Sequence, residues 1–373
     1  MRIGIDARMV NEGLGIGRYI ARLLLHLENV DSNNTYIVFV TRKNWNAYQP
    51  KDSRFTKVCV DIHWYSIAEQ CILPFILMWH RLDLIHFPHV NVPIVYPGRF
   101  IMTVHDLILI KHPLSATSAA TTRHPGIHAA KHFCYRVILG IALRRAAHII
   151  TISESVKSDI LNFFSLSETD ISVTYEAADP LPAPDTCRTL DRFLKVKFFF
   201  RAGNAYPHKN LEGLLSAFKR ARAAQPDTYL LLCGQEDFFQ RRIIDRIAEA
   251  GLSDSVIHLG SVSDSCLSWL YAHAFAYVFP SFEEGFGLPA VEAFLHGCPV
   301  LASDIPVLKE VCGPAALYFD PNNVNDIARA MVTILTQQER RLFLISKGEK
   351  RAKMFSWDRL AKETELVYTR YGL

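Results

Sequence analysis

The sequence lacks an apolar run long enough to cross a membrane. The longest apolar stretch covers residues 71–79, is interrupted by Pro74 and is flanked by Glu69 and Arg81. A membrane-spanning helix needs about 20 consecutive apolar residues, so we expect no transmembrane segment. The N-terminus also lacks a basic and then apolar leader with a cleavage site, because the strand pattern Ile3–Ile5 starts at once. These absences predict a cytoplasmic protein.

Paired cysteine motifs are absent as well. The eight cysteines form no CxxC motif and no Cys/His pairing with zinc spacing. Scattered cysteines of this kind are typical of reduced, mostly buried thiols in the cytosol. We therefore expect neither a disulfide nor a structural zinc ion. The cysteines are Cys59, Cys71, Cys134, Cys187, Cys233, Cys266, Cys298 and Cys312.

Length and composition predict two domains. The chain has 373 residues, half of them hydrophobic, which exceeds what one hydrophobic core normally organises. From Leu181 the sequence reads Leu-Pro-Ala-Pro-Asp-Thr-Cys-Arg, a proline-bearing polar stretch typical of a linker. We predict a first domain over residues 1–185, a second over 186–355 and a final helix over 356–373.

The positive charge is concentrated in the N-terminal part. Residues 1–160 contain 18 Lys and Arg against 11 Asp and Glu, a net charge of +7. Such a bias can attract an anionic surface or a substrate that carries a diphosphate. Ordinary solvated faces explain the same bias equally well.

Strand and helix patterns alternate twice along the chain, which predicts an α/β fold with two doubly wound, Rossmann-like domains. Ligands of such sheets bind beyond the carboxyl ends of the strands, so we expect the site in a cleft between the domains. The predicted strands are Ile3–Asp6, Tyr36–Val40, Leu84–Phe87, Phe100–Val104, His148–Ile152, Lys197–Ala202, Tyr229–Cys233, Val256–Leu259, Ala276–Phe279 and Val300–Ala302. The predicted helices are Ile16–Leu27 and Arg136–Ala147, and others that begin near Asn210, Phe239, Asp264, Leu288, Asn325 and Trp357.

The segment from Pro280 to Ala293 carries the clearest functional signal. It reads Pro-Ser-Phe-Glu-Glu-Gly-Phe-Gly-Leu-Pro-Ala-Val-Glu-Ala and follows a predicted buried strand. Its glycine-rich turn precedes a predicted helix, so backbone N–H groups would point outward from the positive end of that helix. Glu284 enters the turn and Glu292 lies about two turns into the helix, where carboxylates can accept hydrogen bonds from sugar hydroxyls. This arrangement is suited to holding a phosphorylated sugar.

These residues resemble the retaining glycosyltransferases that carry two glutamates separated by seven residues in their C-terminal half. Enzymes of that family have two Rossmann-like domains, an arrangement called the GT-B architecture. The resemblance covers nearly the whole chain and is carried by residues 1–8, 203–210, 284–292 and 355–357. It implies two domains facing across a cleft, the first on the acceptor side and the second binding the nucleotide sugar, with the last helix crossing back to the first domain. In the turn and helix, the implied donor contacts are Gly285, Phe286, Gly287, Leu288 and Glu292.

A second motif, Gly203–Asn210, follows a predicted strand. Its Lys209 supplies an ammonium group that can neutralise a diphosphate, although an ordinary solvated loop lysine is the alternative. In the resembled family the lysine of this motif contacts the donor phosphates, and an arginine often follows the glycine. This chain has Asn204 there, and the sequence leaves open whether Arg201, two residues before Gly203, replaces that cation.

The first domain contains a glycine-rich loop, Gly13-Leu14-Gly15-Ile16-Gly17, between a predicted strand and a predicted helix. Its spacing is not the GxGxxG of dinucleotide sites, so the motif is weak by itself and does not require NAD. A flexible linker is one interpretation. The resemblance favours the other, in which the amides at Gly15 and Gly17 approach the donor phosphates.

His105 and Asp106 end the strand Phe100–Val104 at its carboxyl edge. The resemblance implies that His105 lies beside the donor sugar, where its imidazole can bind a hydroxyl or stabilise charge. Asp106 is the competing acid or base, but aspartate at this place is also a common cap. Ser153, after the strand His148–Ile152, is expected to be an N-cap first and a ligand contact second.

No Asp-x-Asp pair follows a predicted strand as in metal-dependent glycosyltransferases, so we predict that no metal or other cofactor is required. Lys209 and helix-end amides would then stabilise the leaving diphosphate. We assign Glu284 to orienting the sugar and Glu292 to the ribose hydroxyls. The resemblance alone implies retention of configuration.

Two rival functions are weighed against glycosyl transfer. A glycoside hydrolase also uses two carboxylates, but Lys209 and two phosphate-type loops argue against it. A non-catalytic nucleotide-sugar-binding module would keep Lys209 and Glu292 without needing both Glu284 and His105. The presence of all four favours an enzyme.

The pattern along the whole chain is most similar to bacterial mannosyltransferases and related hexosyltransferases of surface polysaccharide synthesis, including O-antigen and exopolysaccharide. This likeness implies GDP-mannose as donor, with UDP-sugars left open, and a polyprenyl-diphosphate-linked saccharide as acceptor at the cytoplasmic membrane face. The stretch His124–Arg145 mixes Lys131, Arg136 and other cations with apolar residues, which favours an amphipathic helix on anionic lipid. A helix packed in the core with ordinary basic flanks is the alternative. No nucleic-acid partner is expected.

Overall fold

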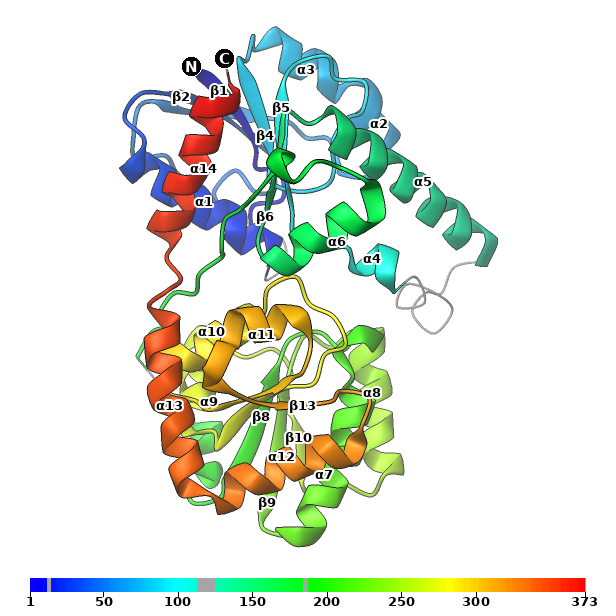
Figure 1. Cartoon of the computed structure of the whole chain (residues 1–373), viewed down its shortest axis with the longest axis vertical. Helices are drawn as coiled ribbons and strands as arrows, with labels where there is room; N and C mark the ends of the chain where they lie inside the picture. Colours follow the sequence, from blue (N-terminus) through cyan, green and yellow to red (C-terminus); the bar gives the residue numbers. More distant parts are fainter. Residues whose placement is uncertain (12–14, 113–124, 184–186, 373) are drawn as a thin grey trace. The chain divides into compact units, whose positions relative to one another are not determined.

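The computed structural model describes residues 1–11, 15–112, 125–183 and 187–372, apart from the side chains of residues 125–131, 188 and 189. The chain forms two compact units (Figure 1). Unit 1 contains residues 1–110, 125–177 and 356–373, and unit 2 contains residues 111–124 and 178–355.

Unit 1 is built on a parallel sheet of seven strands in the described part of the chain. The strands in sheet order are β3 (Phe55–Cys59), β2 (Thr35–Val40), β1 (Arg2–Asp6), β4 (Leu84–Phe87), β5 (Phe100–Val104), β6 (His148–Thr151) and β7 (Ile171–Val173). The helices are α1 (Ile16–Val30), α2 (Ile67–Cys71), α3 (Leu73–Trp79), α4 (Ile108–Lys111), α5 (Pro125–Arg145), α6 (Glu154–Phe164) and α14 (Trp357–Tyr371), with a 3-10 turn at Glu168–Asp170.

Unit 2 repeats this architecture with a parallel sheet of six strands among the residues that the structure describes. In sheet order these are β10 (Val256–His258), β9 (Thr228–Cys233), β8 (Lys197–Ala202), β11 (Ala276–Phe279), β12 (Val300–Ser303) and β13 (Ala316–Phe319). The helices are α7 (Leu211–Ala224), α8 (Phe238–Glu249), α9 (Asp264–His273), α10 (Leu288–Leu295), α11 (Pro306–Cys312), α12 (Val324–Thr336) and α13 (Gln338–Ala352), with 3-10 turns at Arg188–Phe193, Pro207–Lys209 and Gly313–Ala315.

The central strands are rich in apolar residues because helices cover both faces of each sheet. Every residue of β5 is buried, and so is every residue of β11 and β12. In each unit the strand order reverses beside the first strand, which gives the doubly wound arrangement. The prediction of an α/β fold with two Rossmann-like sheets is therefore confirmed.

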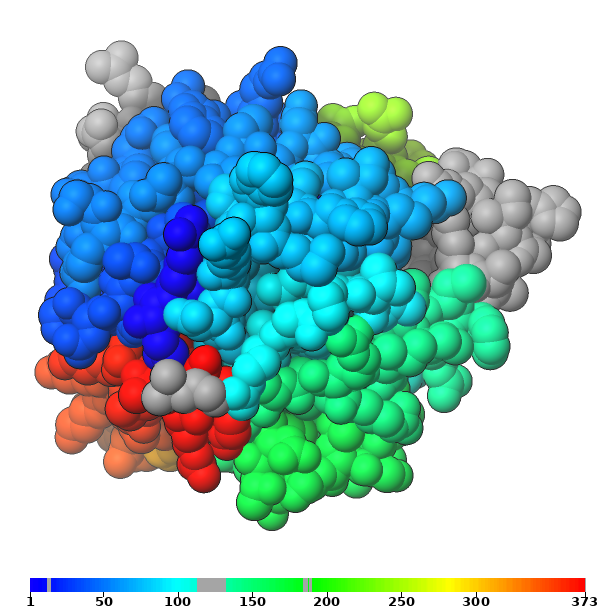
Figure 2. All heavy atoms as spheres, turned by 90° about the horizontal axis from the view of Figure 1, so that it is seen from above, coloured from blue at the N-terminus to red at the C-terminus, as the bar shows by residue number. Residues whose placement is uncertain are grey.

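The final helix α14 belongs to unit 1. It packs against α1 in Figure 1, and Tyr368 and Leu360 on it are fully buried. His26 on α1 binds the carboxylate of Asp358 on α14, with Nδ1 and Oδ1 2.6 Å apart. The two chain ends also meet, since Met1 contacts the backbone near Gly372, and Figure 2 shows the dark blue and red residues side by side.

Several elements were missing from the predicted set, namely the strands β3, β7 and β13 and the helices α2, α3, α4, α6, α11 and α13. Most of them are too short to show a clear period, and the longer α13 has few apolar residues. None of the helices in the described ranges is both long enough and apolar enough to span a bilayer.

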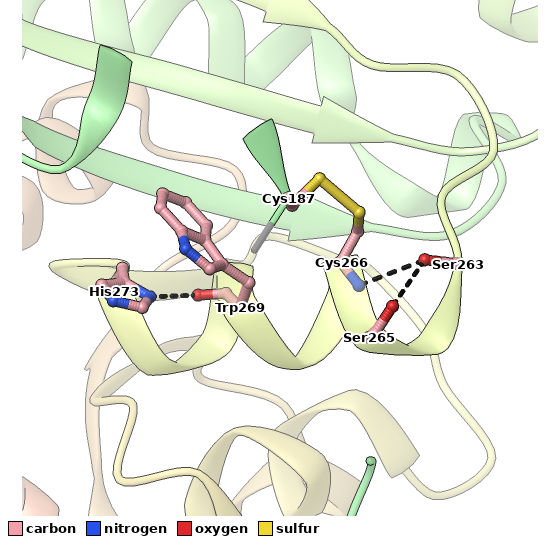
Figure 3. Close-up of a disulfide and its surroundings, with 6 residues drawn as sticks. All are labelled: Cys187, Ser263, Ser265, Cys266, Trp269 and His273. Carbon is pink, nitrogen blue, oxygen red and sulfur yellow. Dashed lines mark hydrogen bonds between the residues drawn. A yellow bond between two sulfur atoms is a disulfide. The ribbon is translucent and has the colours of Figure 1, made fainter. Parts of the chain in front are cut away.

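The prediction that the chain forms no disulfide is wrong. Cys187 and Cys266 are joined by a disulfide between the start of unit 2 and helix α9 (Figure 3). The two residues are 79 positions apart in sequence, so only the fold brings their Cα atoms to 5.5 Å. Disulfides are rare in the reducing cytosol, so the cysteines no longer support a cytoplasmic location.

We expect the bond between Cys187 and Cys266 to be present in the purified protein and to stabilise unit 2 by about 2–4 kcal/mol, because it restricts the unfolded chain. Under denaturing conditions an alkylating reagent should label the six free cysteines, and all eight after reduction. The variant Cys266→Ser should give the same labelling with and without reductant, whereas Cys134→Ser should keep the difference. Full labelling of the unreduced wild-type chain would show that the disulfide is absent.

Candidate active site

The turn between β11 and α10 depends on a glycine. Gly287 precedes the first residue of α10 with φ of +107°, a conformation that side chains disfavour. A Cβ atom at this position would lie 2.9 Å from Leu308 and 3.3 Å from Phe279. Pro289 has no N–H and the Ala290 amide donates to the Gly287 carbonyl, so neither residue offers an amide to a ligand.

Glu284 and Lys209 form the charged centre of this edge of unit 2. The Lys209 ammonium lies 2.8 Å from each carboxylate oxygen of Glu284, and the side chains are 15 % and 9 % exposed. Burial opposes ionisation of Glu284, but the Lys209 charge and hydrogen bonds outweigh it and lower the pKa of the carboxyl. Glu284 therefore holds Lys209 at the carboxyl ends of β8 and β11.

This pairing leaves capacity for a ligand. An ammonium has three N–H donors, and two of those on Lys209 go to Glu284. A carboxylate offers about four lone pairs, so Glu284 can still accept from hydroxyl groups. The pair can thus bind a phosphate oxygen and a sugar hydroxyl at once.

Two further bonds join the loop after β8 to the loop after β11. The Phe282 amide donates to the His208 carbonyl at 2.8 Å. Asn210 adopts φ of +54° and donates its side-chain amide to the carbonyls of Pro280 and Pro321, at 3.1 and 2.8 Å. These contacts fix the separation of Lys209 from Glu284. They could not be predicted, since the sequence of a loop asparagine shows neither its turn nor its partners.

Arg201 holds the Gly203 loop through a hydrogen bond to its backbone. Its side chain is buried in β8, and its Nη1 donates to the Asn204 carbonyl at 2.7 Å. A Cβ atom added at Gly203, where φ is +118°, would lie 3.4 Å from that guanidinium nitrogen. Burial lowers the pKa of Arg201. The guanidinium thus holds the Gly203 loop in place. This loop contains Asn204, at the position where the resembled family often has an arginine.

Three glycines lie at the ends of neighbouring strands, and only the first of them was singled out from the sequence. Gly203, Gly234 and Gly260 follow β8, β9 and β10. The Gly203 amide donates to the Cys233 carbonyl, and the Gly234 amide donates to the Gly260 carbonyl. A Cβ atom at Gly234 would lie 2.4 Å from the Gly203 oxygen. The sequence does contain a signal for all three glycines, because each of them directly follows a predicted strand.

Two predicted donor contacts, Glu292 on α10 and Phe286 in the turn before it, are buried. Glu292 is 6 % exposed and accepts a hydrogen bond from the Tyr271 hydroxyl at 3.0 Å. The ring of Phe286 is buried edge-on against Phe355, with ring centroids 5.4 Å apart. Any ligand contact of Phe286 would therefore come from its backbone. Gly285 is buried in the same turn, and Leu288 is half-buried.

His105 lies at the carboxyl end of β5 in unit 1 and is 8 % exposed. Its Nε2 lies 2.9 Å from the Pro88 carbonyl, and its Nδ1 lies 3.2 Å from Glu176. The ring packs edge-on against Tyr19 of α1, with centroids 4.7 Å apart. Sequence reasoning missed Glu176 because 71 positions separate it from His105.

The remaining residues singled out in unit 1 have local roles. Asp106 accepts from the Ile108 amide at 2.9 Å, and Ser153 accepts from the Val156 amide at 3.2 Å as the N-cap of α6. Gly15 is exposed before the first residue of α1, and a Cβ atom there would meet nothing within 4 Å. Gly17 is buried in the first turn of α1, while Gly13 lies outside the described residues.

Residues 188–351 match the family described as "Glycosyl transferases group 1". Over 336 residues the chain is 26% identical to O-antigen chain mannosyltransferase RfbU of Salmonella typhimurium, covering 85% of this chain and 86% of that protein. It is 32% identical to O-antigen chain mannosyltransferase B of Escherichia coli over 234 residues, which cover 61% of each protein.

Two solved structures share the fold. A sucrose-phosphate synthase from Thermosynechococcus elongatus superposes with a TM-score of 0.80 at 19% identity, covering 99% of this chain and 98% of the other. HepE of Anabaena, in complex with UDP and glucose, gives a TM-score of 0.75 at 16% identity, covering 99% of this chain and all of the other.

Replacing Lys209 tests the charged centre without a ligand. Lys209→Met leaves Glu284 buried and unpaired, so we expect a loss of about 3 kcal/mol of unfolding free energy at neutral pH. The folded-state pKa of Glu284 is lowered, so the stability from this carboxylate is full above its unfolded pKa and disappears as pH falls through the folded pKa. Denaturant unfolding should therefore show the variant and wild type converging in acid.

The matched control is Lys350→Met, an exposed lysine on α13. It should change stability by no more than about 0.5 kcal/mol at any pH. Equal effects of the two substitutions, or a Lys209→Met defect that persists unchanged in acid, would contradict the pairing with Glu284.

Proposed function

The chain is a group 1 glycosyltransferase with the GT-B fold, and on that premise we propose that it transfers mannose from GDP-mannose to a lipid-linked saccharide in surface polysaccharide synthesis. The observation that carries the proposal is the Lys209–Glu284 pair at the carboxyl edge of the unit 2 sheet. The choice of mannose is supported by relatives that are O-antigen mannosyltransferases.

The unit 2 residues suit a nucleotide sugar in three respects. The remaining N–H of Lys209 and the backbone N–H groups of the turn that starts α10 can bind the diphosphate. Gly203 and Gly260, where an added Cβ atom would meet nothing closer than 3.4 Å, let a nucleoside approach the backbone. Glu292 is assigned to the ribose hydroxyls and Glu284 to the sugar, with their remaining lone pairs as acceptors.

Negative charge grows on the leaving diphosphate as the glycosidic bond breaks. Lys209 is already charged and held in place by Glu284, so little reorganisation is needed when that charge develops. Positive charge grows on the sugar, where Glu284 supplies a carboxylate. From unit 1, His105 is assigned to the same reaction. We propose that transfer proceeds with retention and without a metal ion.

The test of this function is a panel of nucleotide sugars with EDTA present, in which release of nucleoside diphosphate is measured with and without a lipid-linked oligosaccharide pool. We expect release from GDP-mannose only when the acceptor is present. Release from a UDP-sugar would overturn the donor assignment. Tight binding of GDP-mannose with no release in any arm would favour a nucleotide-sugar-binding module.

Within the same assay, Lys209→Met should lower kcat/KM by about 10²–10³-fold, the usual effect of losing one donor to a developing negative charge. Lys350→Met, the exposed control, should retain wild-type activity. Assays below the unfolding temperature of the Lys209 variant keep lost stability apart from lost catalysis. Wild-type activity in a folded Lys209→Met protein would remove Lys209 from the diphosphate site.

The lipid-linked acceptor makes an anionic membrane surface the proposed partner of α5. Phe133 and Val137 on this helix are 68% and 43% exposed, and Arg136 between them is exposed, while Leu139 and Leu143 are buried. This exposed set combines apolar groups with a cation, as a lipid headgroup region favours.

Two other cations expected on this surface are engaged locally. Arg145 donates to the Tyr96 carbonyl at 2.6 Å, and Arg144 donates to the Gly140 carbonyl at 3.2 Å. The Lys131 side chain lies outside the described residues. Among the three cations whose side chains are described, Arg136 therefore has the clearest access to lipid.

The double variant Phe133→Asn/Arg136→Gln should reduce co-sedimentation with vesicles of anionic and neutral phospholipid by at least about fivefold, since one cation near the surface contributes about 1 kcal/mol. The control is Leu342→Asn/Arg340→Gln, which changes the same kinds of exposed side chains on α13. Equal binding of both variants would argue against α5. A loss seen only with Trp79→Ser would instead place the lipid contact on α3, where Trp79 is 84% exposed.

A further inference from the structure

Both ring nitrogens of His105 face groups that only accept hydrogen bonds. Nε2 lies 2.9 Å from the Pro88 carbonyl oxygen, and Nδ1 lies 3.2 Å from a carboxylate oxygen of Glu176. A neutral imidazole carries one N–H and can satisfy one of these acceptors. Both bonds form together when the ring is an imidazolium, or when Glu176 itself carries the second proton.

The surroundings place the charge on His105. Burial opposes protonation of the ring. The hydrogen bond and charge of Glu176 outweigh burial and raise the pKa of His105, and the Pro88 carbonyl and Asp106 act in the same direction. Tyr19 of α1 presents a ring that stays neutral, because burial raises its pKa.

Two other histidines face His105 from β4 and the loop after it. Burial and the charge of His105 lower the pKa of His86 and of His89 to about 3 each, so neither competes for the proton near neutral pH. His89 Nδ1 accepts a hydrogen bond from the Asn91 amide, which requires that nitrogen to be unprotonated. His86 is held between the Tyr368 and Thr103 hydroxyls at 2.7 and 2.8 Å.

We propose that Glu176 is a positioning residue that keeps His105 as a fixed imidazolium, so that His105 enters the reaction positively charged and does not act as a proton acceptor. The two N–H bonds are already committed to Pro88 and Glu176, which also fixes the ring plane. The part of this inference that concerns transfer rests on the proposed function, while the ion pair does not.

Glu176→Gln removes the carboxylate charge but keeps the size and an acceptor oxygen. Burial then dominates, so the pH at which His105 titrates should fall by about 1–3 pH units, the usual effect of losing a nearby opposite charge. NMR of the His105 ring carbons during a pH titration measures this without any substrate. In the wild type we expect an imidazolium at neutral pH, and in the variant a neutral ring.

Activity supplies the second measurement. Glu176→Gln should lower kcat by about tenfold at neutral pH and recover as the pH falls, because the ring regains its proton in acid. Glu176→Asp should restore most of the wild-type pH profile. Glu168→Gln, which changes an exposed carboxylate in unit 1, should leave both the titration and kcat unchanged.

The outcomes separate this inference from the proposed function. A neutral His105 at neutral pH in the wild type, or a titration that Glu176→Gln does not change, overturns the ion pair whether or not the protein transfers sugar. A shifted titration with no change in the pH profile of kcat overturns the role in transfer. Failure of every nucleotide sugar to react, with the shift present, rejects the proposed function and leaves the ion pair established.

Discussion

All strands of each sheet run in the same direction, and the arrangement of the candidate site follows from this constraint. Parallel strands bring their carboxyl ends to one edge, so loops that are distant in sequence meet there. In unit 2 the loops after β8 and β11 lie 75 positions apart at Lys209 and Glu284, yet these residues form an ion pair. The same rule in unit 1 places His105 after β5 beside Glu176, which follows β7.

Hydrogen bonds beside the Lys209–Glu284 pair fix its geometry at this edge. The Phe282 amide donates to the His208 carbonyl and the Asn210 side chain donates to the Pro280 carbonyl, so both bonds join the loop after β8 to the loop after β11. The attraction within a buried ion pair offsets the cost of removing both charges from water only when the geometry is good and further hydrogen bonds are made. The loop connections are therefore as much a part of the site as the charges.

Unit 1 organises its polar interior differently. His86, Thr103, Tyr19 and Tyr368 form a chain of buried hydrogen bonds that reaches from β4 and β5 to the C-terminal helix. Buried polar networks of this kind are costly unless every member has a partner, so they specify one arrangement of α14 against the sheet. The position of His105 thus depends on the packing of the last helix as well as on its own strand.

The sequence by itself determined the two Rossmann-like sheets and the motif residues at their edges. Apolar strand runs and glycine-rich turns are local patterns, so β5, β11, the Gly287 turn and the positions of Lys209 and Glu284 could be read directly. Only the tertiary structure decided the partners. The Cys187–Cys266 disulfide, the Asn210 contacts, the burial of Phe286 against Phe355 and the bond between His105 and Glu176 all join residues far apart in the chain. Such pairings depend on where the strand order brings loop ends together, and no spacing along the sequence records that geometry.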